Sequence, residues 1–208
     1  MKLYLTKTPR IIQQIFKNYT WYFSSDKKEI YLTFDDGPTP EITEFVLSEL
    51  RKHNAKATFF CIGKNVAEEP EIYNQIIEEE HQIGNHTNNH TKGSKTKTKA
   101  YIENIMLAEK QLQNNAKLFR PPYGKIKRSQ AKKLRSLGFK IIMWDVLSAD
   151  FDTSISKNKC LENVLKNTTN GSIIVFHDSV KASEKLKYVL PKVLKYYSEK
   201  GFVFKAIA

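Results

Sequence analysis

Residues Ile30-Tyr31-Leu32-Thr33-Phe34-Asp35-Asp36-Gly37-Pro38 join an apolar run directly to two carboxylates and a turn. The β-branched and aromatic residues predict a strand, and Gly37 with Pro38 permits a sharp turn after it. Two adjacent carboxylates at a strand end can point in different directions, so one can bind a metal while the other accepts a proton. Asp, Gly and Pro are also ordinary turn residues, so this motif alone is weak evidence for a site.

Apolar runs alternate with segments of helical period along the rest of the chain. Further strands are expected at 57–62, 83–86, 118–119, 139–144, 172–176 and 202–207. Helical stripes lie between them at 42–50, 72–77, 101–112, 134–137 and 186–197. Thr39-Pro40 predicts one helix start and Gly138 one helix end. This alternation favours an α/β fold with a parallel sheet, open or closed into a barrel, and with its chemistry at the carboxyl ends of the strands.

Length and composition indicate one globular domain. The chain has 208 residues, 40% of them hydrophobic and 27% charged, and a formal net charge of +12. A basic surface attracts nucleic acid, acidic glycans or anionic lipid, although a lysine-rich bias explains the charge equally. The cluster 92–99 is expected to be a solvated loop, or else a rim that meets an acidic substrate. No nucleic-acid motif accompanies the charge, so no nucleic-acid partner is expected.

The cellular location is predicted to be cytoplasmic. The first residues lack the apolar core of a signal peptide, and no apolar run is long enough to span a bilayer. The alternative is export with a leader absent from this sequence. Cys61 and Cys160 lack the spacing of a metal or redox motif and are expected to be free thiols rather than a long-range disulfide.

Polar clusters follow several of the later apolar runs. His86-Thr87-Asn88-Asn89-His90 places two imidazoles four residues apart, which is typical either of an Asn-rich loop or of a metal site. With a strand-end Asp the pair forms a two-His, one-carboxylate set that leaves positions open for water and substrate. In Phe119–Gly124, two prolines give Arg120 a rigid backbone. Residues 144–152 carry three acids. In residues 173–178, an apolar run typical of a buried strand ends at His177.

These five clusters, in this order, resemble the polysaccharide deacetylase family (carbohydrate esterase family 4), the group related to the nodulation-factor deacetylase. The resemblance runs from about Glu29 to Ala208. Its matching motifs are Thr33–Pro38, His86–His90, Arg120–Tyr123 and Val175–His177. The fourth motif departs from the family pattern Asp-x-x-Asp-Trp, because Leu147, Asp150 and Phe151 stand at its defined positions. This departure concerns the positions that select the substrate more than those that carry the chemistry.

The resemblance implies the family's irregular (β/α) barrel of about seven strands. Residues 29–208 would form the catalytic domain, and residues 1–28 an N-terminal extension packing on the core. Four aromatic residues of that extension can stack on sugar rings, but packing against the barrel bottom is the expectation: Tyr19, Trp21, Tyr22 and Phe23.

The resemblance also implies a role for each matching residue. Asp36, His86 and His90 would bind a divalent cation, expected to be zinc, with cobalt, nickel, manganese and iron as alternatives. Asp35 would be the general base and His177 the general acid. Arg120 would pair with Asp35, Asp150 would orient His177, and a backbone N–H near Tyr123 would stabilise the oxyanion. The residues expected to bind substrate are Tyr123, Pro122, Phe151 and Trp144.

The function expected on these grounds is hydrolytic removal of N-acetyl groups from the amino sugars of a polysaccharide or oligosaccharide. The partner would be a glycan with N-acetylglucosamine-like units, and the oligomeric state is left open. One alternative is a related metal hydrolase of another non-peptide C–N bond, such as an N-formyl sugar or a cyclic amide. A catalytically silent glycan-binding domain is the other.

Overall fold

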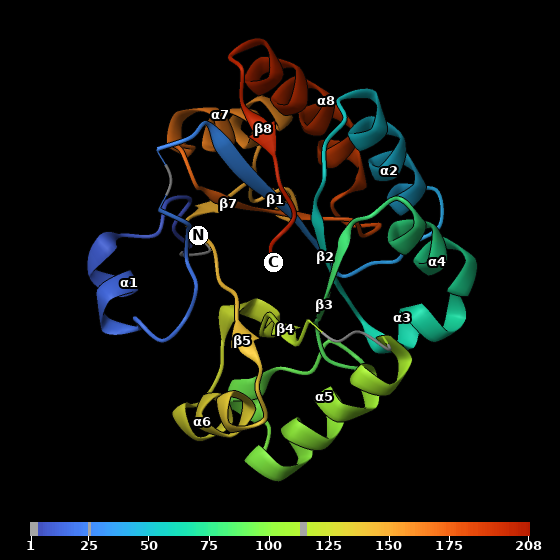
Figure 1. Ribbon diagram of the computed structural model, residues 1–208, viewed down its shortest axis with the longest axis vertical. Helices are drawn as coiled ribbons and strands as arrows, with labels where there is room; N and C mark the ends of the chain where they lie inside the picture. The colour runs from blue at the N-terminus through green and yellow to red at the C-terminus, as the bar shows by residue number, and fades with distance from the viewer. Residues whose placement is uncertain (1–3, 25, 113–115) are drawn as a thin grey trace.

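A computed structural model describes residues 4–24, 26–112 and 116–208. Its centre is a curled parallel sheet in the order β5-β4-β3-β2-β1-β7-β6, with β8 pairing with β1 off this path (Figure 1). The strands are β1 (Glu29–Asp35), β2 (Thr58–Cys61), β3 (Gln82–Asn85), β4 (Leu118–Phe119), β5 (Lys140–Ile141), β6 (Val146–Leu147), β7 (Ile173–His177) and β8 (Val203–Phe204). The irregular barrel of about seven strands expected from the sequence is confirmed.

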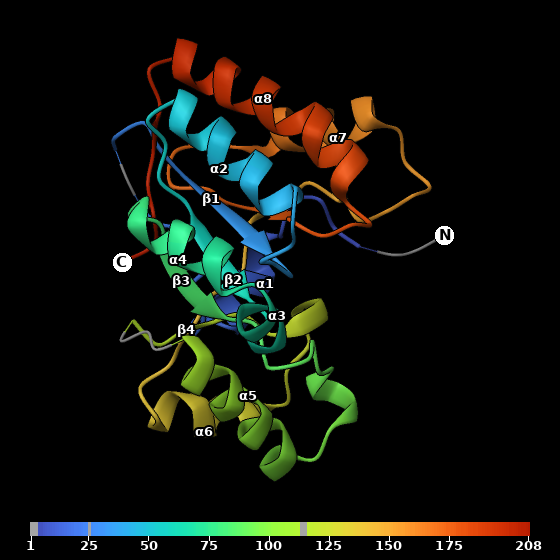
Figure 2. The ribbon, with the colours of Figure 1, turned by 90° about the vertical axis from the view of Figure 1, so that its right-hand side faces the viewer.

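Helices cover the outer surface of this sheet. They are α1 (Arg10–Ile15), α2 (Ile42–Lys52), α3 (Gly63–Glu68), α4 (Pro70–Glu78), α5 (Thr98–Leu112), α6 (Arg128–Ser136), α7 (Lys157–Asn167) and α8 (Ser183–Glu199), with 3-10 turns at Gly93–Lys95 and Pro122–Gly124. Figure 2 shows α2 and α8 side by side over β1 and β2, with α5 and α6 at the opposite end of the molecule. The apolar faces of α2, α4 and α8 form the largest core cluster with β1 and β2.

Most expected elements are present, one predicted helix start is wrong, and helices α1 and α3 were not expected. Helix α2 begins at Ile42 rather than at Thr39-Pro40, because Glu41, in a left-handed conformation, caps it together with Glu44. The Thr39 carbonyl still accepts the first amide hydrogens of the helix. The short strand β6 was not expected, because its two apolar residues stand inside an acidic run. Cys61 and Cys160 are both free and buried, as predicted.

The N-terminal segment closes the gap between the two ends of the curled sheet. Lys7 bridges to Val146 of β6, Thr20 bridges to Ile142 just beyond β5, and Tyr22 bridges to Ser172 just before β7. In Figure 1, α1 accordingly lies outside the sheet between β5 and β7. These backbone contacts cap strand edges that would otherwise expose unpaired amide and carbonyl groups.

The aromatic residues of this segment divide between core and surface. Trp21 is buried and packs with Tyr19 into a cluster formed by α5, α6 and β5, and its indole N–H donates to the Phe16 carbonyl. Phe23 packs on Tyr31 at the start of β1, whereas Tyr22 is 50% exposed. Packing on the side of the barrel therefore accounts for Tyr19 and Trp21 better than packing on its bottom. In the described part of the chain no helix is long and apolar enough to cross a membrane.

We call the contact of the N-terminal segment with β5, β6 and β7 the seam. Replacing Trp21 with alanine tests whether this seam stabilises the fold. Because its ring is buried in an apolar cluster, we expect Trp21→Ala to lower the free energy of unfolding by about 3–5 kcal/mol. The half-exposed Tyr22→Ala is the matched control and should change it by only about 0.5 kcal/mol. Urea denaturation followed by far-ultraviolet circular dichroism, which reports the backbone, measures the free energy of unfolding of both variants. Equal losses in the two variants would contradict this account of the seam.

Candidate active site

The turn after β1 presents Asp35 and Asp36 at the centre of the sheet's carboxyl edge. Asp35 is the last residue of the strand and is buried, while Asp36 has a φ of 85° that turns its side chain away from that of Asp35. Gly37 is required next, because a Cβ there would overlap the carboxylate of Asp178. The two neighbouring carboxylates therefore face different groups.

Arg120, directly after β4, crosses the barrel interior to reach Asp35. Its guanidinium is fully buried, and Nη1 donates to Asp35 Oδ1 and to Thr33 Oγ1 at 2.7 Å each. Its Nε and Nη2 donate to the carbonyls of Ile142 and Met143, at 3.3 and 2.9 Å. Burial lowers the pKa of Arg120 and Asp35 opposes that shift, so the guanidinium depends on its partner.

The two histidines after β3 converge through a strained loop rather than a helix. Thr87 and His90 both have positive φ, of 70° and 55°. Asn85, the last residue of β3, stabilises this loop: its side-chain oxygen accepts the Thr87 N–H, and its amide donates to the Ile105 carbonyl. The rings of His86 and His90 lie 5.2 Å apart as a result. Asn85 follows an apolar run, as many polar residues at strand ends do, so nothing in the sequence indicated that its side chain stabilises the loop.

Asp36, His86 and His90 form a candidate divalent-metal site. Their potential ligand atoms lie within 4.8 Å of one another, and Asp36 Oδ1 is 3.3 Å from His90 Nε2 and 3.7 Å from His86 Nε2. Asp36 Oδ1 is buried and has no hydrogen-bond donor among the described residues. An oxygen lone pair and two imidazole nitrogens directed at one point are the donor set that a divalent transition metal accepts.

The protonation of His86 suits a metal ligand. Burial lowers the pKa of His86 to about 4, outweighing the opposite effect of Asp35 and Asp36, so the ring is neutral near pH 7. Its Nδ1 lies 2.8 Å from the Arg120 carbonyl, which can only accept a hydrogen bond. The Nδ1 proton is thereby fixed, and the Nε2 lone pair faces the cluster. For Asp36, burial raises the pKa, but His177, His86 and His90 outweigh it and keep the pKa low.

His177, the last residue of β7, lies beside Asp35 in the sheet register. The fully buried Asp150 binds it twice, accepting from the His177 N–H and lying 2.8 Å from His177 Nδ1. Burial lowers the pKa of His177, but Asp150 and, more weakly, Asp36 and Asp35 outweigh this and raise it to about 9. The imidazole is therefore protonated near neutral pH and can donate a proton.

The predicted substrate-binding residues lie in different environments. Tyr123 is 59% exposed, with its ring 4.6 Å from that of His90, whereas Pro122 is buried beneath it. Phe151 packs edge-on against His177 at 5.0 Å. Trp144 is partly buried between the Arg120 guanidinium, at 5.8 Å, and Gly124. Tyr123 therefore borders the metal cluster and Phe151 borders His177, while Trp144 packs against Arg120 and Gly124.

Two residues near the site carried no sequence signal that assigned them a role. Asp178 is fully buried and accepts hydrogen bonds from the Gly37 N–H at 3.1 Å and from Thr43 Oγ1 at 2.6 Å, so it supports the Asp35–Gly37 turn; burial raises its pKa to about 7. Tyr4 packs against Phe151 at 5.7 Å and donates to Asp152 at 2.8 Å. Its partner lies 148 residues away, and no local pattern reveals such a contact.

Comparison with known proteins identifies the family. A family model described as Polysaccharide deacetylase matches residues 23–142, more than half of the sequence. The chain belongs to the polysaccharide deacetylase family. The match includes the Asp36, His86 and His90 cluster and Arg120, and it ends before Asp150 and His177.

Individual family members extend the similarity beyond residue 142. A peptidoglycan-N-acetylglucosamine deacetylase of Bacillus cereus is 38% identical over 169 residues, covering 78% of this chain and 61% of that protein. A second one from the same organism is 32% identical over 193 residues, with 91% of each chain covered. A chitooligosaccharide deacetylase of Azorhizobium caulinodans is 33% identical over 166 residues, or 77% of this chain and 79% of that protein. This chain thus spans about three fifths of the first relative's length.

Solved structures of the family share the fold. The Bc1960 peptidoglycan N-acetylglucosamine deacetylase matches with a TM-score of 0.88 and 33% identity, over 96% of this chain and 95% of that one. BA3943 of Bacillus anthracis, a CE4 family pseudoenzyme, matches with a TM-score of 0.78 and 22% identity, over 90% of this chain and 66% of that one. The latter likeness shows the fold alone.

Metal binding tests the cluster independently of any reaction. Because Asp36 and His90 each supply one of three converging atoms, Asp36→Ala and His90→Ala should weaken zinc binding by more than the roughly 10–100-fold typical of losing an outer-shell partner. Titration against a competing chelator measures this. Asp35→Asn should retain the metal, and His53→Ala, which removes an imidazole outside the cluster, is the control. Retention of full affinity in Asp36→Ala would exclude this site.

Proposed function

We propose that this chain is a metal-dependent hydrolase that removes N-acetyl groups from the amino sugars of a glycan. The observation that carries the proposal is that Asp35 and His177, neighbours at two strand ends, flank the Asp36–His86–His90 cluster from the same edge of the sheet. A base and an acid beside a metal site are the groups that amide hydrolysis needs. A pseudoenzyme shares the fold, so the proposal rests on these side chains rather than on the architecture.

The cation would be held by Asp36, His86 and His90, and zinc is the proposed metal because two imidazoles and one carboxylate suit it. When bound, such a cation lowers the pKa of a coordinated water and polarises the acyl oxygen. Cobalt, nickel, manganese or iron fit the same donor set. Elemental analysis of the protein as purified would identify which of these metals it carries.

Asp35 is the proposed general base. The bond from Arg120 fixes its Oδ1, which leaves Oδ2 as the oxygen to take the proton of the attacking water. Because Arg120 is anchored by two backbone carbonyls and by Thr33, the carboxylate cannot rotate away from this position. Arg120 therefore acts through Asp35 as a positioning residue.

His177 is the proposed general acid. An amine leaves readily only when it is protonated, and the hydrogen-bonded pair with Asp150 keeps the imidazole charged and its Nε2 proton available. The backbone N–H of Tyr123 is proposed to stabilise the oxyanion, because this residue lies next to a metal ligand, with its ring 4.6 Å from that of His90. Tyr123 and Phe151 would contact the sugar from opposite sides.

The proposed substrate is a glycan with N-acetylglucosamine units, because relatives that act on peptidoglycan and on chitooligosaccharides are 32–38% identical to this chain. Leu147 and Phe151 in the fourth motif leave a different N-acyl group or a cyclic amide as the alternative reaction. A cytoplasmic location, the division at residue 28 and the absence of a nucleic-acid partner stay predictions from the sequence.

Acetate release from N-acetylglucosamine oligomers tests this function. Asp35→Asn should lower the rate roughly 10²–10⁴-fold with the metal still bound, because it removes the base and not a ligand. Asp26→Asn, at an exposed carboxylate, is the control. Absence of release from the metal-loaded protein, with formate release from N-formyl sugars, would favour the alternative reaction. If no N-acyl substrate is hydrolysed, the remaining alternative is a catalytically silent glycan-binding domain.

The pH dependence of the rate tests the assignment of His177. With a pKa raised to about 9, the imidazole is protonated below that pH and loses its proton above it, so kcat should fall on the alkaline side. A cation held at Asp36 would repel the imidazolium, so this limb would move to lower pH when the metal is bound. Asp150→Asn removes the group that raises the pKa while burial continues to lower it, so the alkaline limb should move to lower pH still. An unchanged limb in Asp150→Asn would exclude His177 as the acid.

A further inference from the structure

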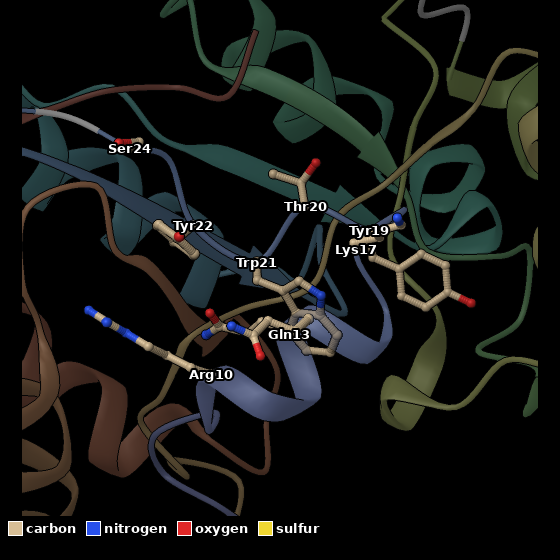
Figure 3. Close-up of a pocket in the computed structure, with 9 residues that line it drawn as sticks. Arg10, Gln13, Lys17, Tyr19, Thr20, Trp21, Tyr22 and Ser24 are labelled. Atoms are coloured by element: carbon tan, nitrogen blue, oxygen red, sulfur yellow. The ribbon is translucent and has the colours of Figure 1, made fainter.

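A trough of about 620 Å³ lies on the N-terminal segment, away from the metal cluster. One wall is α1 and the other is the extended stretch 19–24, as Figure 3 shows. Its lining consists of Arg10, Gln13, Gln14, Lys17, Tyr19, Thr20, Trp21, Tyr22 and Ser24. Amide, hydroxyl and cationic groups around aromatic rings are the side chains that bind sugars, since sugars offer many hydroxyls and an apolar face.

Several of these side chains are fixed before any ligand arrives. The buried Trp21 is anchored by its indole N–H to the Phe16 carbonyl, and Gln13 donates to the Thr8 carbonyl at 3.2 Å. Tyr22 is held by its backbone bridge to Ser172, yet half of its surface remains exposed. An exposed ring on a rigid backbone is a stacking platform that costs little conformational entropy on binding.

A second, smaller hollow of about 300 Å³ continues this trough toward the active site. It shares Tyr19 and Trp21 with the first and adds Phe16, whose ring stacks on Tyr19 at 5.7 Å. Its far side is formed by Gly124 and Lys125, which follow Tyr123 in the chain. Because Tyr123 borders the metal cluster, a strand bound there would meet this hollow next.

The charge around the trough is of one sign. Residues 1–24 and 110–144 contain fourteen of the 34 Lys and Arg and none of the 22 Asp and Glu. The two stretches pack together, because Tyr19 lies in one apolar cluster with Leu134 of α6. The rest of the chain is slightly acidic, so these two stretches supply the net positive charge of the protein. Of their cations, Arg120 is buried and paired with Asp35, and Lys7 is paired with Asp145, whereas Arg10, Lys17 and Lys125 line the two hollows.

We propose that these hollows form a second subsite, which binds a glycan strand carrying carboxylate groups and extends the substrate site past Tyr123. Tyr22 and Phe16 would stack on sugar rings, and Arg10 and Lys17 would pair with carboxylates. The inference rests on the proposed function for its substrate class. The binding it describes is measurable without hydrolysis.

The experiment measures binding in the Asp35→Asn background by calorimetry. The probes are peptide-free peptidoglycan glycan strands, which carry a carboxylate on alternate sugars, and neutral chitin oligomers of equal length. Arg10→Gln with Tyr22→Ala should weaken binding of the carboxylate strand about tenfold, as expected for losing two anchoring contacts. Lys195→Gln with Tyr188→Ala, on α8, is the matched control and should leave it unchanged.

Separate outcomes address the subsite and the proposed function. With Asp35 intact, the Arg10 and Tyr22 double variant should deacetylate chitobiose as the parent does and show a raised KM for the carboxylate strand. Equal strand binding by parent and double variant would overturn the subsite while leaving the deacetylase function in place. If the parent protein hydrolyses no substrate but still binds the carboxylate strand more tightly than the double variant does, only the proposed function would be overturned. Binding to anionic phosphatidylglycerol vesicles but not to the strand would also overturn the subsite, in favour of a lipid surface.

Discussion

The buried pair of Arg120 and Asp35 is the interaction on which the rest of the site depends. A guanidinium with no exposed surface is tolerated only if each of its donors is satisfied, and here a carboxylate, a hydroxyl and two backbone carbonyls do so. These partners belong to the ends of β1 and β5, while Arg120 itself follows β4. One side chain therefore fixes the relative positions of three strand ends, and its own carbonyl positions His86.

Two histidines at this edge show how environment assigns different chemistry to one residue type. Burial lowers the pKa of both His86 and His177, yet the pKa of His86 falls to about 4 and that of His177 rises to about 9. The difference comes from the partner of Nδ1, which is a neutral carbonyl for His86 and the Asp150 carboxylate for His177. The same edge of the sheet thus provides a neutral imidazole suited to bind a metal and a charged imidazole suited to donate a proton.

Much of this could be predicted from the sequence because the information is local. Strand-end polar residues such as Asp36 and His177 follow apolar runs, and in a parallel sheet those ends meet at one edge. Two features that could not be predicted depend on distant contacts, namely Tyr4 against Phe151 and Asp178 against Gly37. The left-handed conformation of Thr87 is local, but no turn residue such as Gly marks that position in the sequence. The strand β6 escaped for another reason, since two residues carry too little periodicity to be recognised.

The seam formed by the N-terminal segment has a consequence for the order of folding. Residues 7 to 22 are synthesised before their partners at Val146, Ile142 and Ser172, which emerge from the ribosome much later. Closure joins residues separated by more than a hundred positions, so it raises the contact order and belongs among the last events of folding. Until closure, residues 7 to 22 lack the strand edges with which they pair in the folded protein.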